Sequence, residues 1–218
     1  MATPTRLRGK AGIVVQALLL HPKRTRQVTD LAADAHVSAA LTHRVLTRLE
    51  EEGIVVAQGA GPNRVRRVTN PTALLDLWAE ENVDRPTRTL AYRLAQTPQR
   101  LINELGGRLG RSGIGYALTG AAAASLVAPF MTALPVAEVW VQATAAAEQV
   151  FDAVEAEPVS DGHNVVFLQA KDDAPIVFRE KIEDLWIVNR FRLYVDLRRD
   201  PRRGREQADH LRREVIGF

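Results

Sequence analysis

The sequence predicts an α+β protein in which an N-terminal winged helix-turn-helix is followed by a mixed α/β C-terminal domain. Three helical patterns and two short strand-like runs fill residues 1–70, and helical and strand patterns alternate later in the chain. The charge divides similarly, because residues 1–70 hold eleven Lys and Arg against five acids, whereas residues 112–197 hold five against twelve. We therefore expect a DNA-binding domain over residues 1–82, a helical connector over 83–111 and an α+β regulatory domain over 112–218.

The composition, with 46% hydrophobic and 25% charged residues in 218, is that of a soluble globular protein. The absence of cysteine excludes a disulfide framework, a thiolate zinc site and a cysteine nucleophile. A cytoplasmic location is expected, because Gln16 interrupts the apolar run 13–20 and no small-residue cleavage pattern follows. The uncharged segment 112–137 contains three glycines and two prolines, so it predicts a buried helix and then a strand, not a membrane span.

The first third of the chain predicts three helices, because apolar residues recur at helical spacing over residues 10–20, 27–35 and 38–52. Ser38 is a natural N-cap for the third helix, and Gly53 suits the position after its last turn. A turn of only about three residues separates the second helix from the third, which is typical of the near-perpendicular helix-turn-helix. The third helix is therefore expected to enter the major groove of DNA.

A hairpin is expected after the third helix. Residues 54–58 and 65–69 are strand-like, and the sequence Gly59-Ala-Gly-Pro-Asn63 between them suits a hairpin tip. Val65 and Val68 are expected to face inward, and the arginines of the second strand to lie near phosphates or a minor groove. The hairpin is thus the predicted wing.

The predicted DNA contacts are residues of the third helix outside its apolar stripe, together with residues of the wing. Thr42, His43 and Arg44 lie in the first two turns and are expected to read bases. The alternative is that these residues are solvated polar groups of a small helical domain that binds protein. The predicted set is Ser38, Ala39, Thr42, His43, Arg44, Thr47, Arg48, Asn63, Arg64, Arg66 and Arg67.

The segment from Leu31 to Val55, Leu-Ala-Ala-Asp-Ala-His-Val-Ser-Ala-Ala-Leu-Thr-His-Arg-Val-Leu-Thr-Arg-Leu-Glu-Glu-Glu-Gly-Ile-Val, resembles the winged helices of bacterial regulators of the MarR and ArsR type. The resemblance implies a fold and double-stranded DNA as the ligand. It implies no particular regulon.

The rest of the chain alternates between helical and strand patterns. A helix is expected from Pro71 and another over Pro98–Leu109, with a domain boundary near residues 82–90. The C-terminal domain is expected to contain helices over 119–128, 144–155 and 203–216, a strand over 136–143, and strand-like runs over 164–169, 175–179 and 185–197, the last with a break at Asn189-Arg190.

Three segments of the C-terminal domain resemble AbiEi-type antitoxins and their stand-alone relatives. They are Tyr116-Ala-Leu-Thr-Gly120-Ala-Ala, Asn164-Val-Val-Phe-Leu, and Leu193-Tyr-Val-Asp-Leu197 with Pro201-Arg-Arg-Gly204-Arg-Glu-Gln-Ala208-Asp-His-Leu211. The resemblance implies a DNA-binding regulator that represses its own operon. It also implies a cognate nucleotidyltransferase-like toxin as a partner in the antitoxin case.

Enzyme motifs are missing from the sequence, so no catalytic residue, metal or cofactor is expected. Neither a G-x-G-x-x-G nor a P-loop is present, and the five histidines lack metal-ligand spacing. A metal-dependent nuclease is the weakest alternative, with Asp161 and the Gln169-Ala-Lys171 run as its candidates, because a glutamine replaces the required acid. Asp196 is expected to pair with Arg192 or Arg203.

Three functions remain open at this level: a sequence-specific regulator, an antitoxin acting mainly on its toxin, and a DNA-targeted nuclease. One helix reads about four base pairs, so tight operator binding requires a dimer or a second surface. The arginine-rich stretch 198–205 is the candidate second surface, and a solvated turn is the equal alternative. The oligomeric state is left open.

Overall fold

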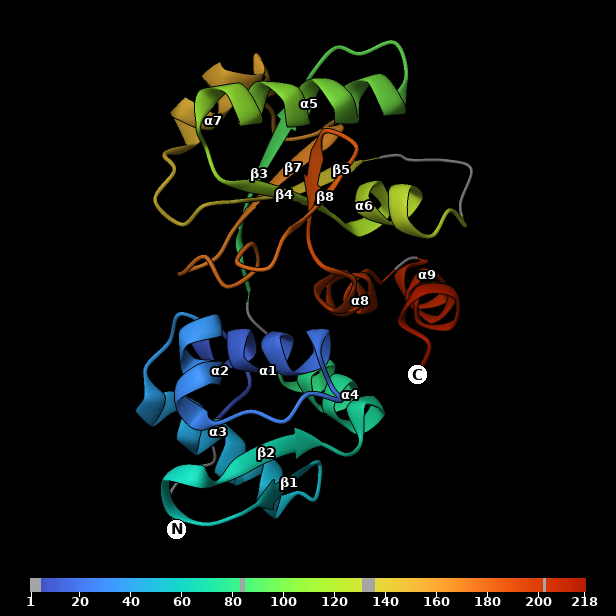
Figure 1. Cartoon of the computed structure of the whole chain (residues 1–218). Helices are drawn as coiled ribbons and strands as arrows, with labels where there is room; N and C mark the ends of the chain where they lie inside the picture. Colours follow the sequence, from blue (N-terminus) through green and yellow to red (C-terminus); the bar gives the residue numbers. More distant parts are fainter. Residues whose placement is uncertain (1–4, 83–84, 131–135, 202) are drawn as a thin grey trace. The chain divides into compact units, whose positions relative to one another are not determined.

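The computed structural model describes residues 5–82, 85–130, 136–201 and 203–218. The chain divides into two compact units, which we call unit 1 (described residues 5–82 and 218) and unit 2 (described residues 85–130, 136–201 and 203–217). Both units combine helices and strands, which confirms the α+β class (Figure 1). None of the helices formed by the described residues has the length and hydropathy of a membrane span.

Unit 1 places three helices before a two-stranded hairpin and a fourth helix after it. The hairpin is antiparallel, with Val55 opposite Val68 and Gln58 opposite Val65, and a 3-10 turn at Gly61–Asn63 forms its tip. The elements are α1 (Lys10–Leu20), α2 (Val28–Asp34), α3 (Ala39–Glu51), β1 (Val55–Gln58), β2 (Val65–Val68) and α4 (Pro71–Glu81).

The boundaries of the unit 1 helices follow from local residues. The Ser38 hydroxyl accepts a hydrogen bond from the Leu41 amide at 3.3 Å, which confirms it as the N-cap of α3. Gly53 has a φ of 71°, a left-handed conformation that lets the chain leave α3 and enter β1. The Asn70 side chain caps α4 in the same way, accepting from the Ala73 amide at 2.9 Å.

The segment before α2 extends the small sheet of the hairpin. The backbone amide and carbonyl of Arg26 both pair with those of Arg66, each at 2.8 Å. The β2 strand therefore lies between β1 and the Arg26 segment, which fixes the hairpin against the helices. This short pairing carries no apolar periodicity, so the sequence pattern does not reveal it.

Unit 2 is a three-layer arrangement around a mixed sheet of order β6-β3-β7-β5-β4-β9-β8. Helices α5 and α7 cover one face, and α6, α8 and α9 lie on the other (Figure 1). The bounds are β3 (Thr87–Tyr92), α5 (Pro98–Ser112), β4 (Tyr116–Thr119), α6 (Gly120–Val127), β5 (Ala137–Val141), α7 (Ala147–Val154), β6 (Glu157–Pro158), β7 (Val165–Gln169), β8 (Glu180–Ile182), β9 (Leu185–Ile187), α8 (Arg190–Arg198), α9 (Gly204–Leu211) and a π-helical turn, η2 (Arg212–Ile216).

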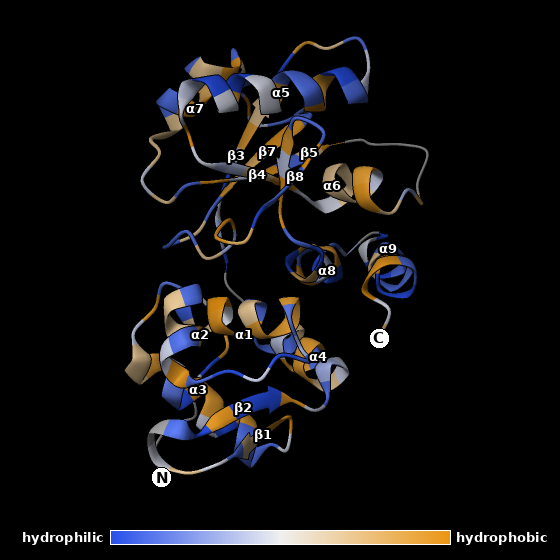
Figure 2. Cartoon of the chain, in the orientation of Figure 1, coloured by the Kyte–Doolittle hydropathy of each residue, from blue (hydrophilic) through white to orange (hydrophobic). Residues whose placement is uncertain are grey.

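The core of unit 2 lies on the central strands. All four residues of β4 and the first four of β7 are buried, as continuous apolar strands covered on both faces should be. Figure 2 shows the same contrast, with hydrophobic residues on β5 and β7 and hydrophilic residues over much of α5 and α9. The central strands of the sheet thus hold most of the apolar core of unit 2.

Three local predictions for unit 2 are wrong. The expected helical connector contains β3, which pairs with β7 from Thr87 to Ala91 and therefore belongs to the sheet. The expected strand 175–179 begins in a turn, because the Ile176 amide bonds back to the Asp173 carbonyl at 2.9 Å. Residues 190–198 form helix α8 in place of a strand, because the Asn189 side chain caps the amides of Phe191 and Arg192.

Asp196 is the central polar residue of unit 2. Its carboxylate lies 2.8 Å from the Arg192 guanidinium and accepts hydrogen bonds from Trp140 Nε1 at 2.7 Å and Thr119 Oγ1 at 2.8 Å. The Arg192 guanidinium also lies over the Trp140 ring, 4.7 Å from its centroid. This cluster joins α8 to β4 and β5, so the predicted pairing with Arg192 is confirmed and has a structural role.

We predict that Asp196→Asn lowers the free energy of unfolding by about 3–5 kcal/mol, because the Arg192 side chain, only 4% exposed, would keep an uncompensated charge. Chemical denaturation measures the loss. Asp209→Asn, at an exposed position of α9, is the matched control and should change stability by less than about 0.5 kcal/mol. Equal effects of the two substitutions would contradict the structural role of Asp196.

Candidate nucleic-acid interface

The exposed side of α3 carries the candidate base-reading residues. Val45, Leu46 and Leu49 are buried against unit 1, as the apolar stripe predicts. The opposite side exposes small or basic side chains over the first two turns, and no acid occurs in α3 before its last turn. These exposed residues are Ala39, Ala40, His43 and Arg44.

Thr42 is not part of this surface, which corrects its predicted role. Its side chain is fully buried, and its hydroxyl donates to the Ser38 carbonyl at 3.2 Å. The reason is helical spacing, since position 42 precedes Val45 by three residues and Leu46 by four and so lies on the apolar stripe. Of the three residues of α3 that were expected to read bases, His43 and Arg44 are exposed, and the Thr47 hydroxyl is hydrogen-bonded to His43 at 3.4 Å.

The predicted DNA contact of Arg48 is also wrong, because its guanidinium is bonded to groups of unit 1. It lies 2.9 Å from the Glu52 carboxylate, donates to the Thr5 carbonyl at 2.7 Å and forms two hydrogen bonds with Glu81. Only 11% of its side chain is exposed. The Arg48–Glu81 pair ties α3 to α4, and the Leu7 amide donates to the same Glu81 carboxylate at 3.0 Å.

The three arginines of the hairpin have different environments. Arg66 is only 4% exposed and bonds one oxygen of Glu50 at 2.5 Å, while Arg64 bonds the other oxygen at 2.5 Å and remains 43% exposed. Arg67 lies on the exposed side of β2. Because side chains alternate along a strand, Arg66 and Val68 face inward together. Arg66 is therefore not an exposed DNA contact as predicted, and Val65 does not share the inward side of Val68.

Other predicted residues lie at the edges of this surface. Asn63 is exposed at the hairpin tip, and Ser38 is exposed while its hydroxyl caps α3. The sequence analysis did not include Lys23 and Arg24 among the candidate DNA contacts. Both are exposed in the loop that leads to the Arg26–Arg66 backbone pair. Two adjacent basic residues directly after Pro22, which ends the first predicted helix, could have indicated a basic surface.

The other candidates from the sequence lie in unit 2. Gln169 is structural, because its amide donates to the carbonyls of Gln142, Ala143 and Ala145 at 2.8–3.2 Å. In the arginine-rich stretch, Arg198 donates to the Tyr194 hydroxyl at 3.1 Å and Arg203 lies 3.9 Å from Glu206. Arg202 of that stretch lies outside the described residues.

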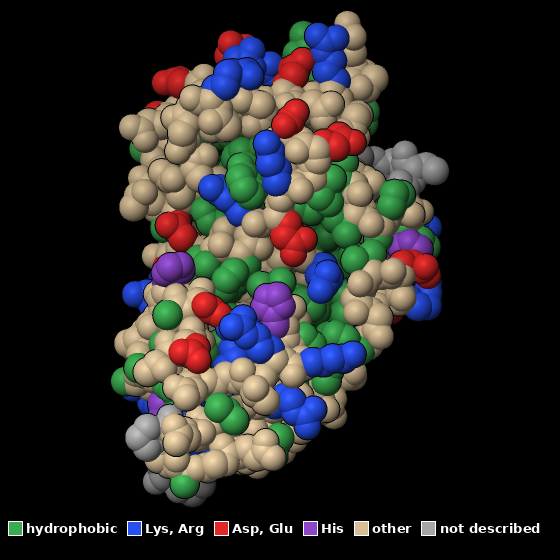
Figure 3. Space-filling view, viewed as in Figure 1, with side chains coloured by type: hydrophobic (Ala, Val, Ile, Leu, Met, Phe, Trp, Pro, Cys, Tyr) green, Lys and Arg blue, Asp and Glu red, His purple; other side chains and the backbone are tan. Residues whose placement is uncertain are grey.

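Charge on the visible surface is mixed, since Figure 3 shows basic and acidic side chains interspersed over both units. Among the described residues, no three His, Asp or Glu side chains are grouped so that they could hold a metal ion. Comparisons with protein-family models, with characterised proteins and with solved structures find no match for this chain.

The ionisation of Glu81 affects the stability of unit 1. The Arg48 guanidinium, followed by the Leu7 amide, holds the pKa of Glu81 below its usual value. The ionised carboxylate therefore stabilises unit 1 at neutral pH, and this contribution is lost as the pH falls from the ordinary glutamate value of about 4.3 through the lowered folded-state pKa.

We predict that Glu81→Gln lowers the free energy of unfolding by about 1.5–3 kcal/mol at pH 7 and that the difference from the parent protein shrinks toward zero as the pH falls through the lowered folded-state pKa of Glu81. Hydrogen exchange of the unit 1 amides measures this local stability. Glu80→Gln, at the exposed neighbouring position, is the control and should follow the parent at every pH. A constant difference between Glu81→Gln and the parent across the acid range would show that the charge of Glu81 is unimportant.

Proposed function

We propose that unit 1 is a winged helix-turn-helix that binds double-stranded DNA and that the protein is a sequence-specific transcriptional regulator. The order of elements supports this proposal: α2 and α3 are joined by a short turn at residues 35–38, and the β1–β2 hairpin follows α3. The backbone bridge between Arg26 and Arg66 ties the segment before α2 to the hairpin. The resemblance of residues 31–55 to bacterial winged helices points to the same ligand.

The exposed N-terminal half of α3 is the observation that carries the proposal. Ala39 and Ala40 present small side chains, so this end of the helix can approach base edges closely. The amides of the first turn and the positive end of the helix dipole favour a nearby phosphate. Within the described residues, Arg44 has no ion-pair partner, so its guanidinium can donate to a guanine in the major groove.

The hairpin supports the same proposal through its two exposed arginines. Arg67 points away from the core and has no ion-pair partner among the described residues, while Arg64 shares Glu50 with Arg66. Both can meet the phosphate backbone, and Arg66 positions the strand that carries them. Autoregulation and a toxin partner are supported only by the resemblance of unit 2 to AbiEi-type antitoxins.

We predict that Arg44→Ala weakens binding to the operator by about 1–3 kcal/mol and relaxes the preference at one base pair, because a base-reading arginine contributes discrimination as well as charge. Binding to the operator and to single-base variants of it measures both effects. Arg213→Ala, at an exposed position outside the arginine-rich stretch 198–205, is the control and should bind as the parent does. A uniform weakening on all sequences would identify Arg44 as a phosphate contact.

For the hairpin, the double variant Arg64→Gln with Arg67→Gln should weaken binding to operator and scrambled duplexes alike. Each phosphate contact that is lost should reduce the slope of log K against log salt by about 0.9, because fewer counterions are released. The Glu50–Arg66 pair is retained in this variant, so the fold of the hairpin is preserved. An unchanged slope would show that the hairpin does not contact DNA.

A further inference from the structure

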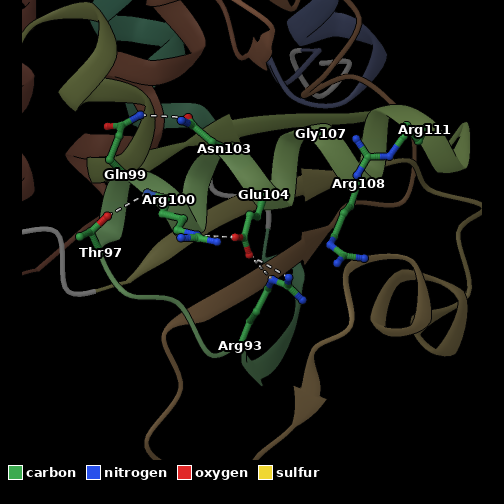
Figure 4. A pocket seen from close by; sticks show the side chains of 9 residues that line it. All are labelled: Arg93, Thr97, Gln99, Arg100, Asn103, Glu104, Gly107, Arg108 and Arg111. Atoms are coloured by element: carbon green, nitrogen blue, oxygen red, sulfur yellow. Dashed lines mark hydrogen bonds and ion pairs between the residues drawn. The ribbon is translucent and has the colours of Figure 1, made fainter.

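The outer side of α5 in unit 2 carries an arginine-lined hollow that the proposed DNA contacts do not use. The hollow has a volume of about 640 Å³ and opens to solvent. Figure 4 shows its side chains projecting from α5 and from the segment before it. The residues that line it are Arg93, Thr97, Gln99, Arg100, Asn103, Glu104, Gly107, Arg108 and Arg111.

Two glutamates hold three of the four arginines in a continuous chain. Glu104 lies 2.8 Å from both Arg100 and Arg93, and the Glu155 carboxylate lies 3.6 Å from Arg93 and 2.6 Å from Arg108. Arg100 and then Arg93 hold the pKa of Glu104 below its usual value, and Arg108 does the same for Glu155, so both acids are ionised at neutral pH. The arginines are therefore ordered before any ligand arrives.

The fourth arginine leaves the cluster with an excess of positive charge. Arg111 is exposed, has no ion-pair partner among the described residues, and extends back along α5 in Figure 4. Four guanidiniums face two carboxylates, so the cluster carries a formal charge of +2. The sequence shows the same bias, because residues 85–111 contain six arginines, no lysine and one acid.

We propose that this hollow, which we call the α5 site, binds a small phosphate dianion, either inorganic phosphate or a phosphate monoester. A monoester carries about −1.5 to −2 charges at pH 7, which matches the excess of the cluster. Planar guanidiniums donate paired hydrogen bonds to phosphate oxygens, and pre-ordering reduces the entropy lost on binding. The lining contains no aromatic ring, so the phosphate group, and not a stacked base, is the recognised part.

Gly107 lines the α5 site next to Arg111. A Cβ at this position would lie 3.4 Å from the Arg111 guanidinium, in van der Waals contact with the group that is expected to meet the phosphate. Gly110 lies one turn later on the same helix and does not line the hollow, and a Cβ at that position would have no neighbouring atom within 4 Å. The two glycines therefore form a matched pair, in which alanine should favour the helix equally but obstruct the site only at position 107.

The test is an NMR titration of the full chain at constant ionic strength with inorganic phosphate, glycerol 3-phosphate and, as a control, chloride. We expect saturable shifts of the Gly107 amide and of the Arg108 and Arg111 Nε–H signals with both phosphates and none with chloride. Arg111→Gln should weaken binding about ten-fold, as expected for the loss of a charge-assisted hydrogen bond. Arg205→Gln, at another exposed helical arginine, should bind as the parent does.

The glycine variants separate a ligand site from a structural network. Gly107→Ala should raise the melting temperature and weaken phosphate binding, whereas Gly110→Ala should raise the melting temperature and leave binding unchanged. Shifts that never saturate, or equal weakening by both alanine variants or both arginine variants, would overturn the proposal. So would a duplex DNA that displaces phosphate and binds less well to Arg111→Gln, because the surface would then be part of a nucleic-acid interface.

Discussion

A guanidinium removed from water must lie against a carboxylate, and this constraint organises both units. Among the described residues, five arginine side chains in ion pairs are 11% exposed or less, and each is paired with an acid of its own unit. Most of these pairs connect different elements, so each also sets how a helix or strand is placed. The pairs are Arg26–Asp34, Arg48–Glu81, Arg66–Glu50, Arg93–Glu104 and Arg192–Asp196.

This constraint separates the arginines that hold the fold from those that can meet a ligand. Counting charges along the chain cannot make that distinction, because Arg66 and Arg67 are neighbours with opposite environments. The +6 balance of residues 1–70 therefore overstates what unit 1 can present to DNA. On α3 and the hairpin, the basic side chains that stay exposed are Arg44, Arg64 and Arg67 with His43, and Lys23 and Arg24 add to them from the loop before α2.

Local signals predicted much of unit 1. The periodicity of residues 10–20, the Ser38 cap and the Gly53 exit were readable because each depends on residues within one or two turns. Thr42 could also have been excluded by the same i, i+3, i+4 rule that identified Val45 and Leu46. The burial of Arg48 and Arg66 could not have been predicted in this way, because their partners Glu81 and Glu50 lie 33 and 16 residues away in the sequence.

Unit 2 was harder to predict because tertiary context overrides local preference there. The aromatic and β-branched run from Phe191 to Leu197 favours a strand, yet the Asn189 cap and the Arg192–Asp196 pair at i, i+4 stabilise a helix. The β3 strand was missed because its arginine and threonines interrupt the apolar pattern. In unit 1, the bridge between Arg26 and Arg66 has one more consequence. It occupies the backbone amide and carbonyl of Arg66 on the side of β2 that faces away from β1, so these groups cannot pair with a strand of another molecule, which disfavours edge-to-edge aggregation there.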